Sequence, residues 1–151
     1  MRALAALQRV LAGEHAAVYV YGVLGGQVSA SHQPSLFAQV EATYERHVHQ
    51  RDRLTEMVRR SHGVPVAADP AYRMPNRAGT PDQVRAAARL VEQRCADLYG
   101  QLVESSTGAD RAWAISALDG AALRVLHFGG APTAFPGLSD RPTRPRRRAR
   151  R

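Results

Sequence analysis

The first 25 residues repeat large apolar side chains at alternating spacings of three and four, a pattern typical of a long helix with one buried face. The repeat consists of Leu4, Leu7, Leu11, Val18 and Tyr21, and Glu14 stands at the position between Leu11 and Val18. A carboxylate on such a face must be paired, hydrogen-bonded, protonated or bound to a metal, because an unsatisfied buried charge costs several kcal/mol or more. The side chains that meet Glu14 therefore constrain both the packing of the chain and the chemistry of its interior.

Three more helices are predicted from the same spacing and from residues that start or end helices. The first helix should cover about residues 2–25, the second 34–62, the third 81–104 after the N-cap Thr80, and the fourth 109–128. The side chains expected to face inward are Phe37, Val40, Tyr44, His47, Arg51, Leu54 and Val58 in the second helix, Val84, Ala88, Val91, Cys95, Leu98 and Leu102 in the third, and Ile115, Leu118, Ala122, Val125 and Leu126 in the fourth.

The connection between the second and third helices is long and cannot be helical, since Pro65, Pro70 and Pro75 interrupt it. At ~3.3 Å per residue, residues 63–79 could span up to about 56 Å, whereas a helix of about 28 residues is only ~42 Å long. The connection can therefore cross the whole bundle and make the third helix parallel to the second. We predict an all-α four-helix bundle with this long crossover.

Four polar residues should meet at one level of that bundle. Measured from the end where the first two helices join, Glu14 and His47 lie at depths of about 17 and 20 Å, and Glu92 and Asp119 at about 17 and 14 Å. Arg51 lies about one turn away from His47 on the same face. We therefore expect a buried polar layer of Glu14, His47, Arg51, Glu92 and Asp119.

The net charge of +8 is concentrated at the C-terminus and does not describe the body of the chain. All 21 basic residues are arginines, and seven of them lie between Arg141 and Arg151, which leaves 14 arginines against 13 acidic residues before them. Residues 1–138 are expected to form the bundle, and residues 139–151 a disordered Arg- and Pro-rich tail. Such a tail can bind nucleic acid nonspecifically, although no aromatic residue is present in it to stack on bases.

Neither a secretory signal nor a membrane span is expected. Gln8, Arg9 and Glu14 interrupt the apolar run at the N-terminus, and no stretch approaches ~18 uninterrupted apolar residues. The lone Cys95 cannot form an internal disulfide, and its place on an apolar stripe favours a packing role. These features predict a cytoplasmic protein.

Several short segments, in this order and spacing, resemble the ferritin-like superfamily, and specifically an actinobacterial ferritin-like family of unknown function. They are residues 14–22 (EHAAVYVYG), His47 with residues 51–52, residues 69–72 (DPAY) leading to Pro75, and residues 135–138 (FPGL). The resemblance covers nearly all of residues 3–138. It implies a four-helix bundle with a long second connection and, for the superfamily at large, di-iron carboxylate chemistry.

The chain departs from the ligand pattern of that chemistry, which needs two Glu-x-x-His pairs in addition to two further glutamates. Glu92 is followed at the third position by Cys95 and Asp119 by Ala122, and Arg51 brings a permanent cation close to the layer. We therefore interpret the layer as a structural network in a non-catalytic binding or assembly protein, with no catalytic residue and no cofactor expected.

Two alternatives stay open beside that interpretation. One is a degenerate di-iron-type oxidoreductase that holds iron or manganese through Glu14, His47, Glu92 and Asp119. The other is a nucleic-acid-associated protein that acts through its arginine tail. The expected partners are a protein or a small molecule, with a homodimer as one of the assemblies considered.

Overall fold

The computed structural model describes residues 2–138. This part of the chain contains four helices and no strands. They are α1 (Arg2–Gln27), α2 (Pro34–Arg60), α3 (Pro81–Ser105) and α4 (Gly108–His127). The predicted all-α four-helix bundle is thus confirmed, while the expected tail of residues 139–151 lies outside the described residues. Within residues 2–138, no helix is long and apolar enough to cross a membrane.

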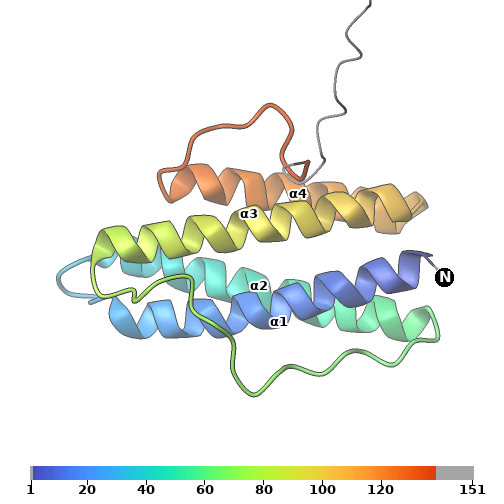
Figure 1. The fold of residues 1–151 in the computed structure, drawn as a ribbon, viewed down its shortest axis with the longest axis horizontal. Coiled ribbons are helices and arrows are strands. Elements are labelled where there is room, and N and C mark those ends of the chain that lie inside the picture. Colours follow the sequence, from blue (N-terminus) through green and yellow to red (C-terminus); the bar gives the residue numbers. More distant parts are fainter. Residues whose placement is uncertain (1, 139–151) are drawn as a thin grey trace, which may run out of the picture.

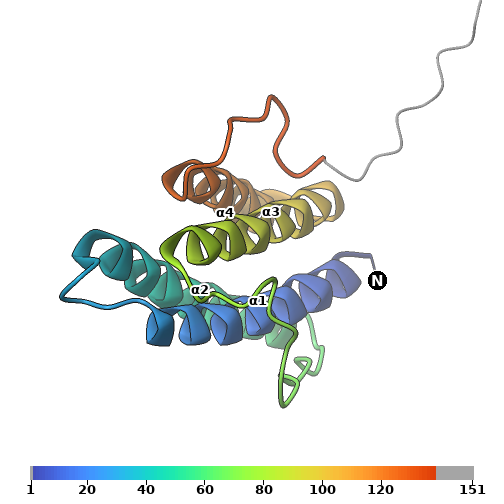
Figure 2. The same ribbon diagram turned by 60° about the vertical axis from the view of Figure 1, so that its left-hand side comes forward.

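The long connection after α2 runs back along the bundle, so α3 starts at the end where α2 starts and the two helices are parallel (Figure 1). This is the crossover that the sequence predicts. The helices form two layers, α1 with α2 and α3 with α4, which meet mainly where α1 packs on α3 (Figure 2). Helices α2 and α4 are not among the closely packed pairs. The side of the bundle that these two helices form, the open side, is therefore the least closely packed.

The crossover is fastened to α1 along its outer face. The side-chain amide of Gln8 donates to the carbonyl oxygen of Val64 at 2.6 Å and accepts from the backbone N–H of Val66 at 2.9 Å. Nε2 of His15 lies 3.1 Å from the carbonyl oxygen of Val66. Extended backbone cannot satisfy its own polar groups, so these side chains supply partners that a helix would not need.

The inward faces of α2 and α4 differ from those predicted. Helix α4 buries Ala114, Ala117, Ala121 and Val125, followed by Phe128, whereas Ile115 and Leu126 of the predicted stripe are exposed. Helix α2 buries Thr43 and Gln50 in place of Tyr44 and Arg51. The prediction is right for the buried Val40, His47, Leu54, Val58 and Val125, so both faces are rotated only in part. One residue turns a helix by about 100°, and α4 carries apolar side chains on every side, so spacing alone does not fix the direction of its inner face.

After α4, residues 131–138 fold back onto α3 through two glycines. Gly137 has φ +80°, and a Cβ on Gly100 would lie 2.6 Å from the carbonyl oxygen of Gly137. The backbone of the segment can therefore touch α3 only where α3 has no side chain. This contact forms one wall of a groove on the outer face of α3 and α4.

We predict that Gly100→Ala displaces this segment while leaving the helices folded. The added methyl group would collide with backbone, and overpacking of this kind typically costs about 1–3 kcal/mol. Limited proteolysis within residues 131–138 should therefore accelerate by roughly tenfold or more. Gly26→Ala is the matched control, because a Cβ on Gly26 in α1 meets nothing within 4 Å; equal acceleration in both variants would contradict the docking role of Gly100.

Candidate functional site

The centre of the bundle holds a histidine between two glutamates, all three essentially inaccessible to solvent. Nδ1 of His47, on α2, lies 2.7 Å from Oε2 of Glu14 on α1, and Nε2 lies 2.9 Å from Oε1 of Glu92 on α3. One imidazole ring thus connects three helices. The structure brings Glu14, His47 and Glu92 together at one level, as their positions along the helices predict.

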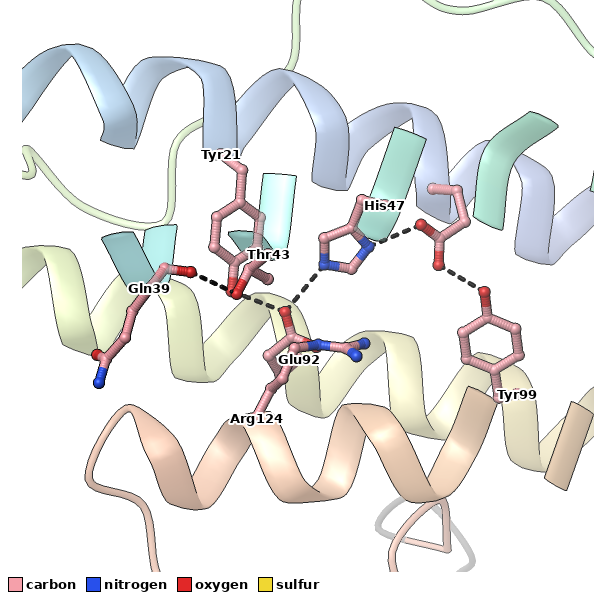
Figure 3. A network of polar contacts seen from close by, with 8 residues as sticks. Tyr21, Gln39, Thr43, His47, Glu92, Tyr99 and Arg124 are labelled. Atoms are coloured by element: carbon pink, nitrogen blue, oxygen red, sulfur yellow. Dashed lines mark hydrogen bonds and ion pairs between the residues drawn. The ribbon is translucent and has the colours of Figure 1, made fainter. Parts of the chain in front are cut away.

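Two tyrosines complete the cluster from opposite sides (Figure 3). The hydroxyl of Tyr99 donates to Oε1 of Glu14, and the hydroxyl of Tyr21 donates to Oε1 of Glu92, both at 2.7 Å. The ring of Tyr21 also stacks on the imidazole of His47, with centroids 5.0 Å apart. Each tyrosine is buried, so its hydroxyl needs the acceptor that a glutamate supplies.

Arg124 brings the fourth helix into the cluster. Its Nε donates to Oε2 of Glu92 at 2.8 Å, and its side chain is 13 % exposed. All four carboxylate oxygens of Glu14 and Glu92 now accept at least one hydrogen bond. Two carboxylates face one imidazole and one guanidinium, so the cluster is neutral when His47 is protonated.

The electrostatics favour that protonated state. Burial by itself lowers the pKa of His47, but the charge of Glu14 and the hydrogen bonds to Glu14 and Glu92 outweigh it and raise the pKa from 6.5 to about 9. Burial likewise acts to raise the pKa of Glu92, yet His47 and then Arg124 hold it below its usual value. Burial, together with the neighbouring carboxylates, raises the pKa of Tyr21 and Tyr99, which keeps both as hydrogen-bond donors.

Two of the predicted members lie elsewhere, and this part of the prediction is wrong. Arg51 is 30 % exposed and pairs with its neighbour Asp52, with Nη2 2.7 Å from Oδ1. Asp119 is exposed on the outer face of α4 and lines the groove there. Both errors follow from the rotated faces of α2 and α4, and Arg124 on the true inner face of α4 supplies the cation that Arg51 was expected to give.

The sequence contains a signal for the hydrogen bonds of both tyrosines, of which Tyr21 was expected on the buried face of the first helix and Tyr99 was missed. Glu14 and Tyr21 on α1 are seven residues apart, and so are Glu92 and Tyr99 on α3. Seven residues are about two helical turns, which puts each Glu and Tyr on one face about 10 Å apart. Because α1 and α3 run in opposite directions (Figure 1), the Tyr of each helix meets the Glu of the other.

A metal ion would find only a partial ligand set in the cluster. Among the described residues, Glu14, His47 and Cys95 each offer one ligand atom, and these atoms lie within 4.8 Å of one another. Burial raises the pKa of the Cys95 thiol, however, and both ring nitrogens of His47 already bond to carboxylates. The chain has no Glu-x-x-His pair, both ring nitrogens of His47 are already bonded, and Arg124 occupies Glu92, so the residues present do not fit a di-iron centre.

We predict that Glu14→Leu lowers the free energy of unfolding by about 3 kcal/mol. The substitution leaves the His47 imidazolium with one carboxylate instead of two and the Tyr99 hydroxyl without its acceptor. Arg51→Gln is the control and should change stability by less than about 0.5 kcal/mol, because Arg51 lies outside the cluster. Chemical denaturation measures both values. Similar losses of stability in the two variants would show that Arg51 belongs to the network and would contradict this assignment.

We predict a further dependence of stability on pH, with its origin in His47. The folded pKa of about 9 exceeds the unfolded value of 6.5, so the stabilisation is complete below pH 6.5 and is lost as pH rises through 9. The difference corresponds to about 3 kcal/mol. The lowered pKa of Glu92 acts in the opposite sense: its stabilisation is present above its unfolded value of 4.5 and is lost at lower pH.

Stability should therefore be greatest between about pH 4.5 and 6.5. Denaturation curves measured from pH 4 to 10 test this, and NMR titration of the His47 ring gives its pKa directly. A His47 titration midpoint near 6.5 would contradict the assignment.

The chain is similar to other proteins in its fold and in its family. In fold it is similar to the crystal structure of a conserved hypothetical protein, rv2844, from Mycobacterium tuberculosis, with a TM-score of 0.77 and 26% sequence identity over 84% of this chain and 87% of that one. No curated protein matches the chain. The profile of a family described as a domain of unknown function (DUF4439) matches residues 6–140, and the chain therefore belongs to that family.

Proposed function

We propose that this protein is a non-catalytic binding bundle of ferritin-like architecture whose buried cluster holds the helices in register. The observation that carries the proposal is the internal satisfaction of the cluster: every oxygen of Glu14 and Glu92 and both ring nitrogens of His47 have a partner. A catalytic or metal centre needs an open position for its ligand, whereas these groups bind one another. The parallel α2 and α3, joined by a long crossover, support the ferritin-like assignment.

Binding is assigned to the groove on the outer face of α3 and α4, which residues 131–137 close on one side. Its volume is about 860 Å³, and sites for small molecules typically measure ~300–1,000 Å³. Leu90, Leu123 and Leu126 give it an apolar, partly exposed lining, to which charges are added by Arg94, Asp97 and Asp119. This combination suits a small amphipathic molecule with an apolar body and one charged group.

The second candidate is a degenerate metal-binding oxidoreductase, and the convergence of Glu14, His47 and Cys95 is the observation in its favour. Carboxylate, imidazole and thiolate together are ligands for iron, manganese or zinc. Binding would require proton loss from Cys95 and His47 and the loss of the hydrogen bond between His47 and Glu14. These losses make it the weaker candidate.

We predict that Nile red, an uncharged apolar dye, binds the folded protein with saturation and in the groove. Leu126→Gln should weaken its binding by roughly tenfold, as expected for the loss of about 1–2 kcal/mol of apolar contact. Ile115→Gln is the matched control: Ile115 is 42 % exposed and Leu126 38 %, both on α4, but only Leu126 lines the groove. Equal effects of the two substitutions would contradict the groove as the binding site.

Elemental analysis of the untagged protein separates the two candidates. The binding bundle should contain less than about 0.1 equivalent of iron, manganese or zinc, since the cluster offers no open ligand position. One or two equivalents that Glu14→Ala removes would overturn the non-catalytic proposal in favour of the metal site.

A further inference from the structure

A second cavity, of about 350 Å³, lies between α2 and α4 on the open side of the bundle. Gln39, Thr43 and Arg46 line it from α2, and Gly120, Arg124 and His127 line it from α4. It is separate from the groove between α3 and α4, although Leu123 borders both. The two cavities therefore differ in the helices that form them and in their chemistry.

The lining of this cavity is basic. Arg46, Arg124 and His127 contribute to it, and no aspartate or glutamate is among the described residues that line it. Arg46 and His127 are exposed, whereas Arg124 is largely buried, so basic groups lie both at the rim and at depth. Arg124 is paired with Glu92 behind the lining, so the exposed Arg46 supplies the charge that most attracts an anion, and His127 adds a basic group at the rim.

Arg124 has hydrogen-bonding capacity that the interior does not use. Its Nε bonds to Glu92, but its Nη2 is buried and has no partner within residues 2–138. A buried donor left unpaired costs about 1–3 kcal/mol, and more when it is charged. The other buried side-chain atom of the described chain without a partner is Oε1 of Gln50 on α2, so both come from the loosely packed helix pair.

Gly120 places the guanidinium at the cavity wall. A Cβ on Gly120 would lie 3.2 Å from Nη1 of Arg124, and both residues line the cavity. Because Gly120 has no side chain, nothing from that position separates the guanidinium from the cavity. From the opposite helix the side-chain amide of Gln39 adds a neutral polar group, whereas the hydroxyl of Thr43 already donates to the carbonyl oxygen of Gln39.

We infer that this cavity binds a small anion carrying a phosphate or carboxylate group, contacted by Arg124 at depth and by Arg46 and His127 at the rim. Nη1 of Arg124 lies at the cavity wall beside Gly120 and can donate a charge-assisted hydrogen bond to such a group, while Nε holds Glu92 and Nη2 stays enclosed. The volume is at the low end for ligand sites, which favours a small molecule. A bound anion would also connect α2 to α4 and thereby close the open side of the bundle.

Titration of the full chain with inorganic phosphate and, in a separate arm, with succinate tests the inference and distinguishes the two anion types. Calorimetry at constant ionic strength should show one saturable site for at least one of them. Arg46→Gln should weaken binding by roughly tenfold, the typical effect of one charge-assisted hydrogen bond. Arg53→Gln, an exposed arginine two turns further along α2 that does not line the cavity, is the matched control and should bind as the wild type does.

A second variant, Gly120→Leu, fills the cavity and should abolish the site. If that variant does not fold, Arg46→Gln still tests the inference, because Arg46 is exposed and outside the buried cluster, so its substitution should leave the fold intact. Absence of saturable binding of either anion, unchanged binding in Arg46→Gln, or equal weakening in Arg53→Gln would overturn the inference. The last outcome would assign the affinity to general positive charge, to which the arginines from Arg141 onward contribute equally in every variant.

Discussion

The packing of three helices depends on the charge of His47. Two buried carboxylates would repel each other in an apolar interior, and the imidazolium between them turns that repulsion into two short contacts of 2.7 and 2.9 Å. The crossed pairs Tyr21–Glu92 and Tyr99–Glu14 make this arrangement specific to one register of α1 against α3. A shift by one residue along either helix would turn a Glu and a Tyr away together, so both pairs would be lost at once.

The fourth helix is held differently, and this difference shapes the outer surface. Ala114, Ala117 and Ala121 let α4 pack closely against α3, and Arg124 adds the ion pair with Glu92. Small side chains inside leave the larger ones, such as Leu123 and Leu126, on the outside. The loose packing towards α2 and the apolar groove beside α3 thus have one origin. Because the inner face of α4 consists mainly of alanines, it buries few large apolar side chains, and the larger ones line the outer surface.

The sequence predicts depth along a helix better than direction around it. Rise per residue is nearly constant, so counting from the helix ends placed Glu14, His47 and Glu92 at one level once the crossover fixed the direction of α3. Direction around the axis changes by about 100° per residue, and the apolar residues all around α4 left its face ambiguous. Asp119 was therefore expected inside and Arg124 was missed. A hydrogen-bond partner such as Tyr99 for Glu14 lies on another helix. To predict it, the distance between the two helices must be known, and the spacing of residues within one helix does not give that distance.

The same reasoning supports the proposal that the acidic and imidazole side chains of the cluster bind one another rather than a metal. Divalent cations are held by an excess of negative ligands, because those ligands must compensate the charge of the ion. Here Glu14 and Glu92 are already matched by His47 and Arg124, and each carboxylate also accepts a tyrosine hydrogen bond. A cation entering the cluster would have to displace a proton from His47 and compete with a guanidinium, whereas the anion proposed for the cavity between α2 and α4 would meet Nη1 of Arg124. The charge pattern therefore disfavours a cation at the centre of the bundle and supports the anion that we propose for the cavity between α2 and α4.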